Sequence, residues 1–137
     1  MKMVKSIAKQ QQIYRACKRV VGKHVYGNLY GVDKSILTSM QIVESAVVTS
    51  AMLGNMHILE IMKRKFDFEN SPDNGGVSVI ALIEESHIAV HTWPESSYAT
   101  VDIYSCGVHS DPKKAFAYII DRFKPKSYKQ YFADRSS

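Results

Sequence analysis

The middle of this chain holds a run of β-prone segments, and segments with helical periodicity lie on either side of that run. Alternating or β-branched stretches bounded by Gly, Pro, Asn or Ser mark the strands. The segments expected as strands are 24–32, 56–62, 77–83, 88–92, 100–104 and 128–132. Strands that cluster apart from the helices favour an α+β fold. We therefore expect a two-layer α/β sandwich with a largely antiparallel sheet and helices on one face.

Two helices are expected to cover that face. One runs from Asp33, a good N-cap, to Gly54, with apolar residues at every third or fourth position. The other carries an apolar stripe over 115–123 and begins at Asp111 or Ser110. Neither segment is apolar all round, so each has one face for a sheet and one for solvent.

The net charge of +5 belongs to one end of the chain. Residues 1–23 hold seven basic residues and no acid, whereas the rest has 11 basic against 13 acidic residues. We therefore divide the chain into a basic N-terminal helical arm, 1–21, and a single domain, 22–137. A basic arm can contact nucleic acid. No aromatic interleaving or binding motif accompanies this charge, so a solvated helix is favoured and no nucleic-acid partner is expected.

Nothing in the sequence indicates a membrane or a secretory route. No run reaches the ~18 uncharged apolar residues of a membrane span. The lysines near the N-terminus are not followed by the apolar core of a signal peptide. Cys17 and Cys106 show no disulfide spacing, which fits a reducing compartment. We expect a soluble cytoplasmic protein.

The stretch from Glu84 to Gly107 concentrates the chemically versatile side chains. It contains two histidines, the only tryptophan, a serine after paired glutamates and one of the two cysteines. His87 and His91 lie four apart on an expected strand, so both side chains point to one face, together with Trp93. This stretch is where a site is expected.

The residue types alone leave several chemistries open. Ser86 lacks the G-x-S-x-G elbow of a hydrolase, so a catalytic triad is unsupported. Zinc could be held by the two histidines with Cys106 and His109, but the spacing matches no established pattern and no metal is expected. Cys106 is either a small buried hydrophobe or a titratable proton carrier.

Two strings dominate the stretch. They are ESHIAVHTWPE, residues 85–95, and ATVDIYSCG, residues 99–107. Together they resemble the processing and active-site core of prokaryotic S-adenosylmethionine decarboxylases. Ser78, which would assist processing, and Asp111-Pro112 also stand where the family pattern expects them, and a weaker match runs over 22–123. The resemblance implies the sandwich fold and a homodimer of αβ units with active sites near the subunit interface.

The resemblance also implies a self-cleaving proenzyme. The Ser86 hydroxyl would attack the Glu85 carbonyl and convert the peptide bond into an ester. His91 would be the proton acceptor that removes the Ser86 α-proton, so that the ester splits by elimination. The products would be a β chain, 1–85, and an α chain, 86–137, whose first residue becomes a covalent pyruvoyl cofactor.

In turnover, the resemblance implies that the pyruvoyl group binds the substrate amine as a Schiff base and withdraws electrons as CO₂ leaves. Cys106 would return a proton as general acid. Glu95 would bind ribose hydroxyls, and Trp93 would line the substrate site. Because alternate strand residues share a face, His91 and Cys106 are expected to face a common pocket. The implied carboxy-lyase would supply decarboxylated S-adenosylmethionine for spermidine (polyamine) biosynthesis.

The segment Glu69–Gly76 departs from the family pattern. A position that usually carries an aromatic residue for adenine is Pro72 here. Phe66 or Phe68 would have to supply the ring. Two alternatives therefore stay open: a pyruvoyl-dependent arginine or ornithine decarboxylase of the same superfamily, and an uncleaved, catalytically silent homologue that acts as a binding partner.

Overall fold

The computed structural model describes residues 19–71 and 74–137. Most of the expected basic arm, 1–21, and Pro72 therefore lie outside the described residues. The strands are β1 (Gly22–Tyr30), β2 (Ile58–Lys65), β3 (Val77–Ile83), β4 (Ser86–Trp93), β5 (Tyr98–Cys106) and β6 (Ser127–Asp134). The helical segments are α2 (Lys34–Leu37), α3 (Met40–Leu53), the 3-10 turn η2 (Pro94–Ser96) and α4 (Pro112–Phe123).

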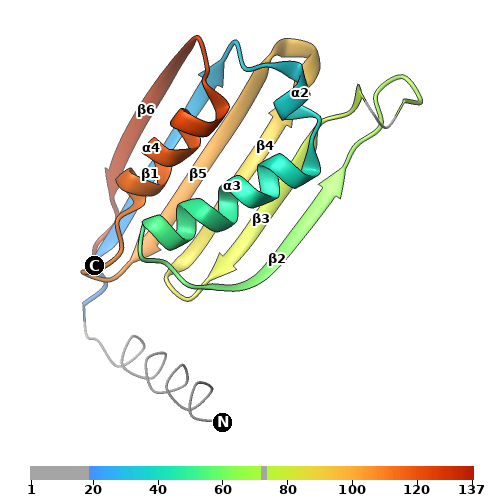
Figure 1. Ribbon diagram of the computed structural model, residues 1–137. Helices are drawn as coiled ribbons and strands as arrows, with labels where there is room; N and C mark the ends of the chain where they lie inside the picture. Colours follow the sequence, from blue (N-terminus) through green and yellow to red (C-terminus); the bar gives the residue numbers. More distant parts are fainter. Residues whose placement is uncertain (1–18, 72–73) are drawn as a thin grey trace.

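The strands form one six-stranded sheet in the order β2-β3-β4-β5-β1-β6, and all neighbouring pairs are antiparallel. Strands β3, β4 and β5 follow one another as a meander, and β1 lies between β5 and β6. Helices α3 and α4 lie side by side across one face of the sheet (Figure 1). The α+β two-layer sandwich expected from the sequence is confirmed.

The helix expected from Asp33 to Gly54 is divided in two. Asp33 caps only the short α2, where its carboxylate accepts a hydrogen bond from the Ser35 N–H at 2.8 Å. The Thr38 hydroxyl then donates to the Lys34 carbonyl, and Ser39 Oγ accepts from Ile42 N–H as the N-cap of α3. Two adjacent hydroxyls that compete for backbone groups favour a break at this point.

The core lies between the helices and the sheet. Phe116 and Ile119 of α4, Val47 of α3 and Ile88 and Ile103 of the central strands are all fully buried. Removing one such side chain from water contributes about 1.5–3 kcal/mol each. This packing fixes β4 and β5, so the side chains on their opposite face project from a rigid platform.

The opposite face of the sheet, called the free face here, is not covered by any described helix (Figure 1). Strand alternation places polar and aromatic side chains on it. They are His24, Tyr26, Ser78, His87, His91, Trp93, Tyr98, Asp102, Tyr104 and Cys106. No helix within residues 19–71 and 74–137 is both long and apolar enough to cross a membrane.

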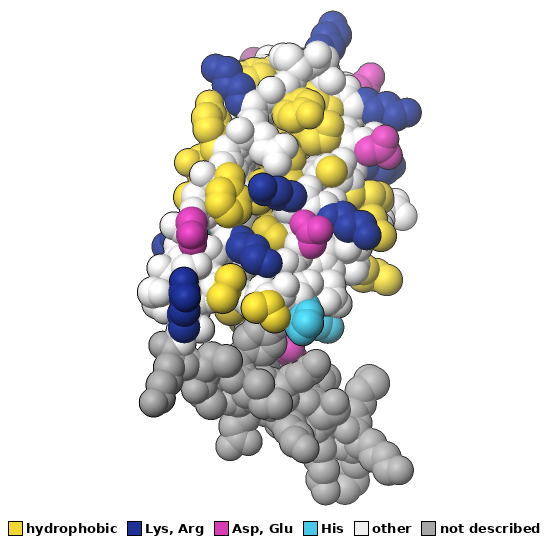
Figure 2. All heavy atoms as spheres, turned by 90° about the vertical axis from the view of Figure 1, so that its left-hand side faces the viewer, with side chains coloured by type: hydrophobic (Ala, Val, Ile, Leu, Met, Phe, Trp, Pro, Cys, Tyr) yellow, Lys and Arg dark blue, Asp and Glu magenta, His cyan; other side chains and the backbone are white. Residues whose placement is uncertain are grey.

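Strand β6 forms one edge of the sheet and exposes Tyr128, Tyr131 and Phe132. Figure 2 views this side of the molecule, where lysine and arginine side chains are spread among the hydrophobic ones. The Lys113 ammonium, for example, lies 4.7 Å from the centre of the Phe132 ring. Lys113 belongs to α4 and Lys129 to β6 itself, and charged side chains on or beside an edge strand oppose edge-to-edge pairing with another sheet. The β6 edge is therefore protected against pairing with another sheet.

Candidate active site

Ser86 begins β4 directly after a tight hairpin. Ile83 pairs with Ser86, so Glu84 and Glu85 form a two-residue loop. Favoured two-residue hairpin loops place a positive φ on Gly or Asn inside the loop. Here neither glutamate has a positive φ, and Ser86 itself has φ +154°. L-residues rarely adopt this conformation, so the strain of the hairpin lies in the backbone of Ser86, directly after the peptide bond from Glu85.

The carbonyl of Glu85 is held from the neighbouring strand. The backbone N–H of Cys106 donates to this oxygen at 2.9 Å, beside the Ser86–Ser105 pair of β4 and β5. A donor at this position polarises the carbonyl and stabilises negative charge that develops on its oxygen during nucleophilic attack. The residues thus fit the formation of a pyruvoyl group from Ser86: a strained serine follows a carbonyl that already has an oxyanion donor.

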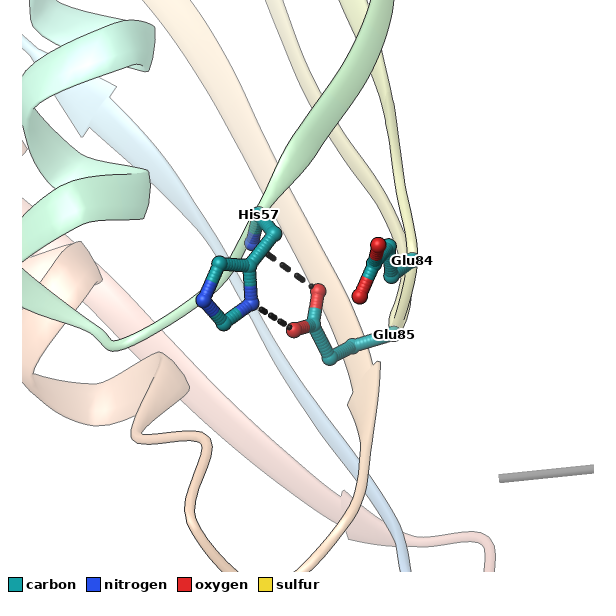
Figure 3. Close-up of side chains that lie close together, drawn as sticks. All are labelled: His57, Glu84 and Glu85. Atoms are coloured by element: carbon teal, nitrogen blue, oxygen red, sulfur yellow. Dashed lines mark hydrogen bonds and ion pairs between the residues drawn. The ribbon is translucent and has the colours of Figure 1, made fainter. Parts of the chain in front are cut away.

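The Glu85 side chain is anchored on its other side by His57, which sequence reasoning missed. The carboxylate is 1% exposed; one oxygen lies 2.7 Å from His57 Nδ1, and the other accepts from the His57 backbone N–H at 3.1 Å (Figure 3). Glu84 lies beside the pair, and its buried Oε2 has no hydrogen-bond partner among the described residues. The adjacent glutamates were the one sequence signal for this cluster. His57 lay within the expected strand 56–62, and nothing in that segment marked it as a functional residue.

Ser78 and His91 form a second group on the free face. They are directly opposite each other on β3 and β4, and Ser78 Oγ lies 2.7 Å from His91 Nδ1. The His91 ring lies 6.3 Å from the ring of Trp93, which in turn lies 5.4 Å from Tyr98. Burial, with a smaller contribution from Tyr30, raises the pKa of the Tyr98 phenol, so this neighbour stays neutral at physiological pH.

A pocket of about 270 Å³ opens beside this second group. It is lined by Phe66, Asp67, Phe68, Gly76, Ser78, His91, Thr92, Trp93 and Glu95. Glu95 and Trp93, expected as substrate residues, thus share a pocket with Ser78 and His91. Both candidate aromatic residues, Phe66 and Phe68, reach it as well. Asp67 was missed, because a single acid in an irregular segment carries no sequence signal.

The expectation that His91 and Cys106 face a common pocket is wrong for a single chain. Both lie on the free face, but His91 pairs with Thr100, six residues before Cys106 on β5. Six residues of extended strand span roughly 20 Å. For the same reason the residues considered for zinc do not converge: the His/Cys/Asp/Glu cluster found within the described residues is His57 with Glu84 and Glu85.

Paired polar groups occupy the free face between the two groups. One oxygen of Asp102 lies 2.9 Å from His24 Nε2 and 3.4 Å from His87 Nε2. The Tyr104 ring lies 5.8 Å from each of the two imidazoles. Between Cys106 and the pocket, the part of the face formed by β1, β4 and β5 thus carries mainly polar and aromatic side chains, whereas Ile80 and Leu82 of β3 add exposed apolar ones.

Comparison with known proteins identifies the family. The sequence matches S-adenosylmethionine decarboxylases over residues 23–136, and the chain belongs to this family. The fold is similar to the crystal structure of the adenosylmethionine decarboxylase from Aquifex aeolicus VF5, with a TM-score of 0.75 and 29% identity over 85% of this chain and 91% of that one.

Two curated relatives are more similar in sequence. The arginine decarboxylase proenzyme of Hyperthermus butylicus is 52% identical over 86% of this chain and 80% of its own length. The arginine decarboxylase proenzyme of Pyrobaculum arsenaticum is 50% identical over 85% of this chain and 86% of its own length. The protein is thus a pyruvoyl-dependent decarboxylase that acts on a small molecule, with a covalent pyruvoyl group derived from one of its serines.

Proposed function

We propose that this protein is a pyruvoyl-dependent arginine decarboxylase that processes itself at Ser86. The observation that carries the choice of substrate is the pocket beside Ser78 and His91, which contains two carboxylates, Asp67 and Glu95. The expected main substrate, S-adenosylmethionine, is not confirmed, because both curated relatives are named arginine decarboxylase proenzymes. Those names agree better with the alternative.

The pocket chemistry suits a guanidinium. A planar guanidinium donates paired hydrogen bonds to carboxylates and stacks on aromatic faces. The pocket offers both kinds of partner: Asp67 and Glu95 for the hydrogen bonds, and Phe66, Phe68 and Trp93 for the faces. The ribose contact implied by the resemblance uses Glu95 alone and leaves Asp67 without a task. Two acids therefore favour a cation over a sugar.

Processing divides the domain, 22–137, at its most strained hairpin. The Ser86 hydroxyl attacks the Glu85 carbonyl, while the Cys106 N–H stabilises the charge on the carbonyl oxygen. Nitrogen leaves the carbonyl carbon, and an ester to Ser86 Oγ replaces the amide. An imidazole, His91, accepts the Ser86 α-proton, and elimination releases Glu85 as the carboxyl end of chain 1–85. Residue 86 hydrolyses to pyruvoyl with loss of ammonia.

Two copies of the chain are needed to assemble this site. Within one chain His91 lies five residues from Ser86 along β4, roughly 17 Å at the rise of a strand. A proton acceptor must come within about 3 Å of the proton that it takes. In a symmetric dimer, each surface patch meets its counterpart, so a second copy can bring its His91 and Ser78 to Ser86 of the first. This requirement supports the homodimer of αβ units that the resemblance implies.

In turnover each chain's residues hold the substrate and move one proton. The pyruvoyl group supplies an electron sink for the bond that breaks as CO₂ leaves. Asp67 and Glu95, which line the pocket, orient the guanidinium. Cys106 Sγ donates the proton to the carbon that lost CO₂. A reducing cytoplasm, expected from the cysteine pattern, keeps this thiol competent as an acid.

The decisive experiment is a CO₂-release assay on purified, cleaved protein with arginine, ornithine and S-adenosylmethionine side by side. We expect release from arginine at a rate at least about tenfold above the other two substrates, the effect of one charge-assisted hydrogen bond that the wrong ligand does not make. Release from S-adenosylmethionine alone would contradict this proposal and support an S-adenosylmethionine decarboxylase of spermidine biosynthesis. If the purified protein instead stays a single intact species on prolonged incubation and releases no CO₂ from any substrate, the silent homologue is supported.

A further inference from the structure

We infer that His57 is a positioning residue for self-cleavage, which it promotes by holding the Glu85 carboxylate and thereby the strained peptide before Ser86. The inference rests on the proposed processing at Ser86. His57 lies outside both resemblance strings, in the connection that leads into β2. Its proposed role is in making the active site, not in turnover.

His57 makes three hydrogen bonds to the two-residue hairpin loop. Its carbonyl accepts from the Glu84 N–H at 2.9 Å. Its own N–H donates to Glu85 Oε2 at 3.1 Å, and its ring Nδ1 lies 2.7 Å from Glu85 Oε1. Figure 3 shows the imidazole and the carboxylate edge to edge, with Glu84 beside them. Backbone and side chain of one residue thus fix both loop glutamates.

The contacts from His57 complement those from β5. The Cys106 N–H holds the Glu85 carbonyl oxygen, and pairing with Ser105 holds Ser86. The peptide between Glu85 and Ser86 is therefore restrained at its carbonyl, at the side chain before it and at the strand after it. A strained φ persists only where the surroundings over-determine it. Without the anchor at Glu85, the plane of this peptide can turn through ψ of Glu85 and φ of Ser86, which relaxes the strain and moves the carbonyl away from the serine hydroxyl.

The pair is poorly explained as a stability device. A buried carboxylate loses its hydration, and well-packed apolar residues often stabilise such a position as well or better. The Glu85 carboxylate is 1% exposed, whereas the His57 side chain is 53% exposed. A second carboxylate, Glu84, lies within 4.8 Å of both. This costly arrangement belongs to Glu85, the residue whose carbonyl is attacked in the proposed processing, which points to a role in that cleavage.

The geometry allows a matched pair of variants. An Asn amide can place its NH₂ near the position of imidazole Nδ1, whereas a Gln amide places it near Nε2. Because the contact to Glu85 uses Nδ1, His57→Asn should cleave faster than His57→Gln. His109→Ala is the control, since this exposed histidine has no side-chain contact described to the hairpin. All variants are full chains.

The measurement is the rate of cleavage of freshly synthesised precursor, followed by denaturing mass analysis, with the thermal unfolding midpoint of each precursor beside it. We expect His57→Gln and His57→Ala to slow cleavage about 100-fold, the scale of an ångström-level misplacement of reacting groups. His57→Asn should recover at least about tenfold of that loss, and His109→Ala should match the unchanged protein. The order Asn above Gln should not follow the unfolding midpoints.

A double-mutant cycle separates this role from a general loss of structure. If His57 acts through the carboxylate, Glu85→Ala with His57→Ala should cleave no more slowly than Glu85→Ala alone. Additive losses, or equal cleavage in His57→Asn, His57→Gln and the unchanged protein, would overturn the inference. If His57→Ala does not fold, the Asn and Gln variants decide alone. An unchanged protein that never cleaves would instead refute the processing at Ser86 itself.

Discussion

Ser78 and His91 face each other across β3 and β4, with the Ser78 hydroxyl oxygen 2.7 Å from His91 Nδ1. A hydroxyl at this nitrogen orients the ring and leaves Nε2 to exchange a proton with another group. Ser86 of the same chain lies five residues before His91, at the start of β4, beyond reach of that nitrogen. Under the proposed assembly from two copies, we therefore expect this pair to act on Ser86 of the other chain.

Two inactive chains should therefore rescue each other. Ser86→Ala removes the attacking hydroxyl, and His91→Ala removes the proton acceptor, so neither variant alone should cleave. When both are co-expressed with different tags, a mixed dimer combines Ser86 of one chain with His91 of the other. With random pairing, half of the dimers are mixed and each has one working site, so about a quarter of all chains should be cleaved.

The most specific outcome of this test is which of the two chains is cleaved. Only the His91→Ala chain should be cut, because it alone retains the Ser86 hydroxyl, and mass analysis of the tagged fragments reads this directly. No cleavage in the mixture would place the proton acceptor within one chain and contradict the assembly in trans. A Ser86→Ala, His91→Ala chain mixed with the unchanged protein serves as the control for subunit exchange.

Asp67 and Glu95 should set the affinity for the guanidinium. Asp67→Asn and Glu95→Gln each remove one charge from the pocket, and loss of a charge-assisted hydrogen bond costs about 1.5–3 kcal/mol. We therefore expect KM for arginine to rise roughly 10- to 100-fold in each variant, measured by CO₂ release. Glu69→Gln, an exposed acid of the same segment that does not line the pocket, should leave KM unchanged. An unaltered KM in Asp67→Asn would remove this residue from the site.

Cys106 should contribute its backbone to processing and its thiol to turnover. In Cys106→Ala the N–H that binds the Glu85 carbonyl is retained, so cleavage should continue at a rate close to that of the unchanged protein. Loss of the general acid should lower kcat about 10²- to 10⁴-fold. Cys106→Ser, which keeps a weaker acid, should lie between the two. Parallel mass analysis and CO₂ assays separate the effects, and normal turnover in Cys106→Ala would exclude the thiol as proton donor.

Gly76, which lies where the pocket meets the sheet, should be required for full stability of the fold. A Cβ on this residue would collide with the Thr92 carbonyl oxygen and lie 3.1 Å from Pro94 Cδ. Gly76→Ala should therefore lower the free energy of unfolding by about 1–3 kcal/mol, the usual effect of overpacking. Urea unfolding of the precursor measures it. Asn74→Ala, at an exposed position of the same segment, is the matched control and should change it little.

The alternation of residues in the sequence correctly predicted which side chains lie on the free face of the sheet. It did not predict how far apart those side chains are. His91, Trp93 and Cys106 all lie on the free face, as period-two spacing requires. That spacing does not say which residues of two strands are opposite each other. The register, Thr100 against His91 and Ser105 against Ser86, follows from the hairpin turns and the packing under the helices. It separates two groups that the sequence had placed in one pocket.

By itself, the sequence determined the fold class, the self-processing family and the residue types of the chemistry, because these depend on local periodicity and on two long contiguous strings. The tertiary structure alone decided which residues meet. It brought Asp67 from an irregular segment to Glu95, placed His57 against the Glu85 carboxylate, and put the hairpin strain at Ser86. These contacts join segments far apart in the chain, and their geometry is set by strand register and core packing, which no single stretch of sequence contains.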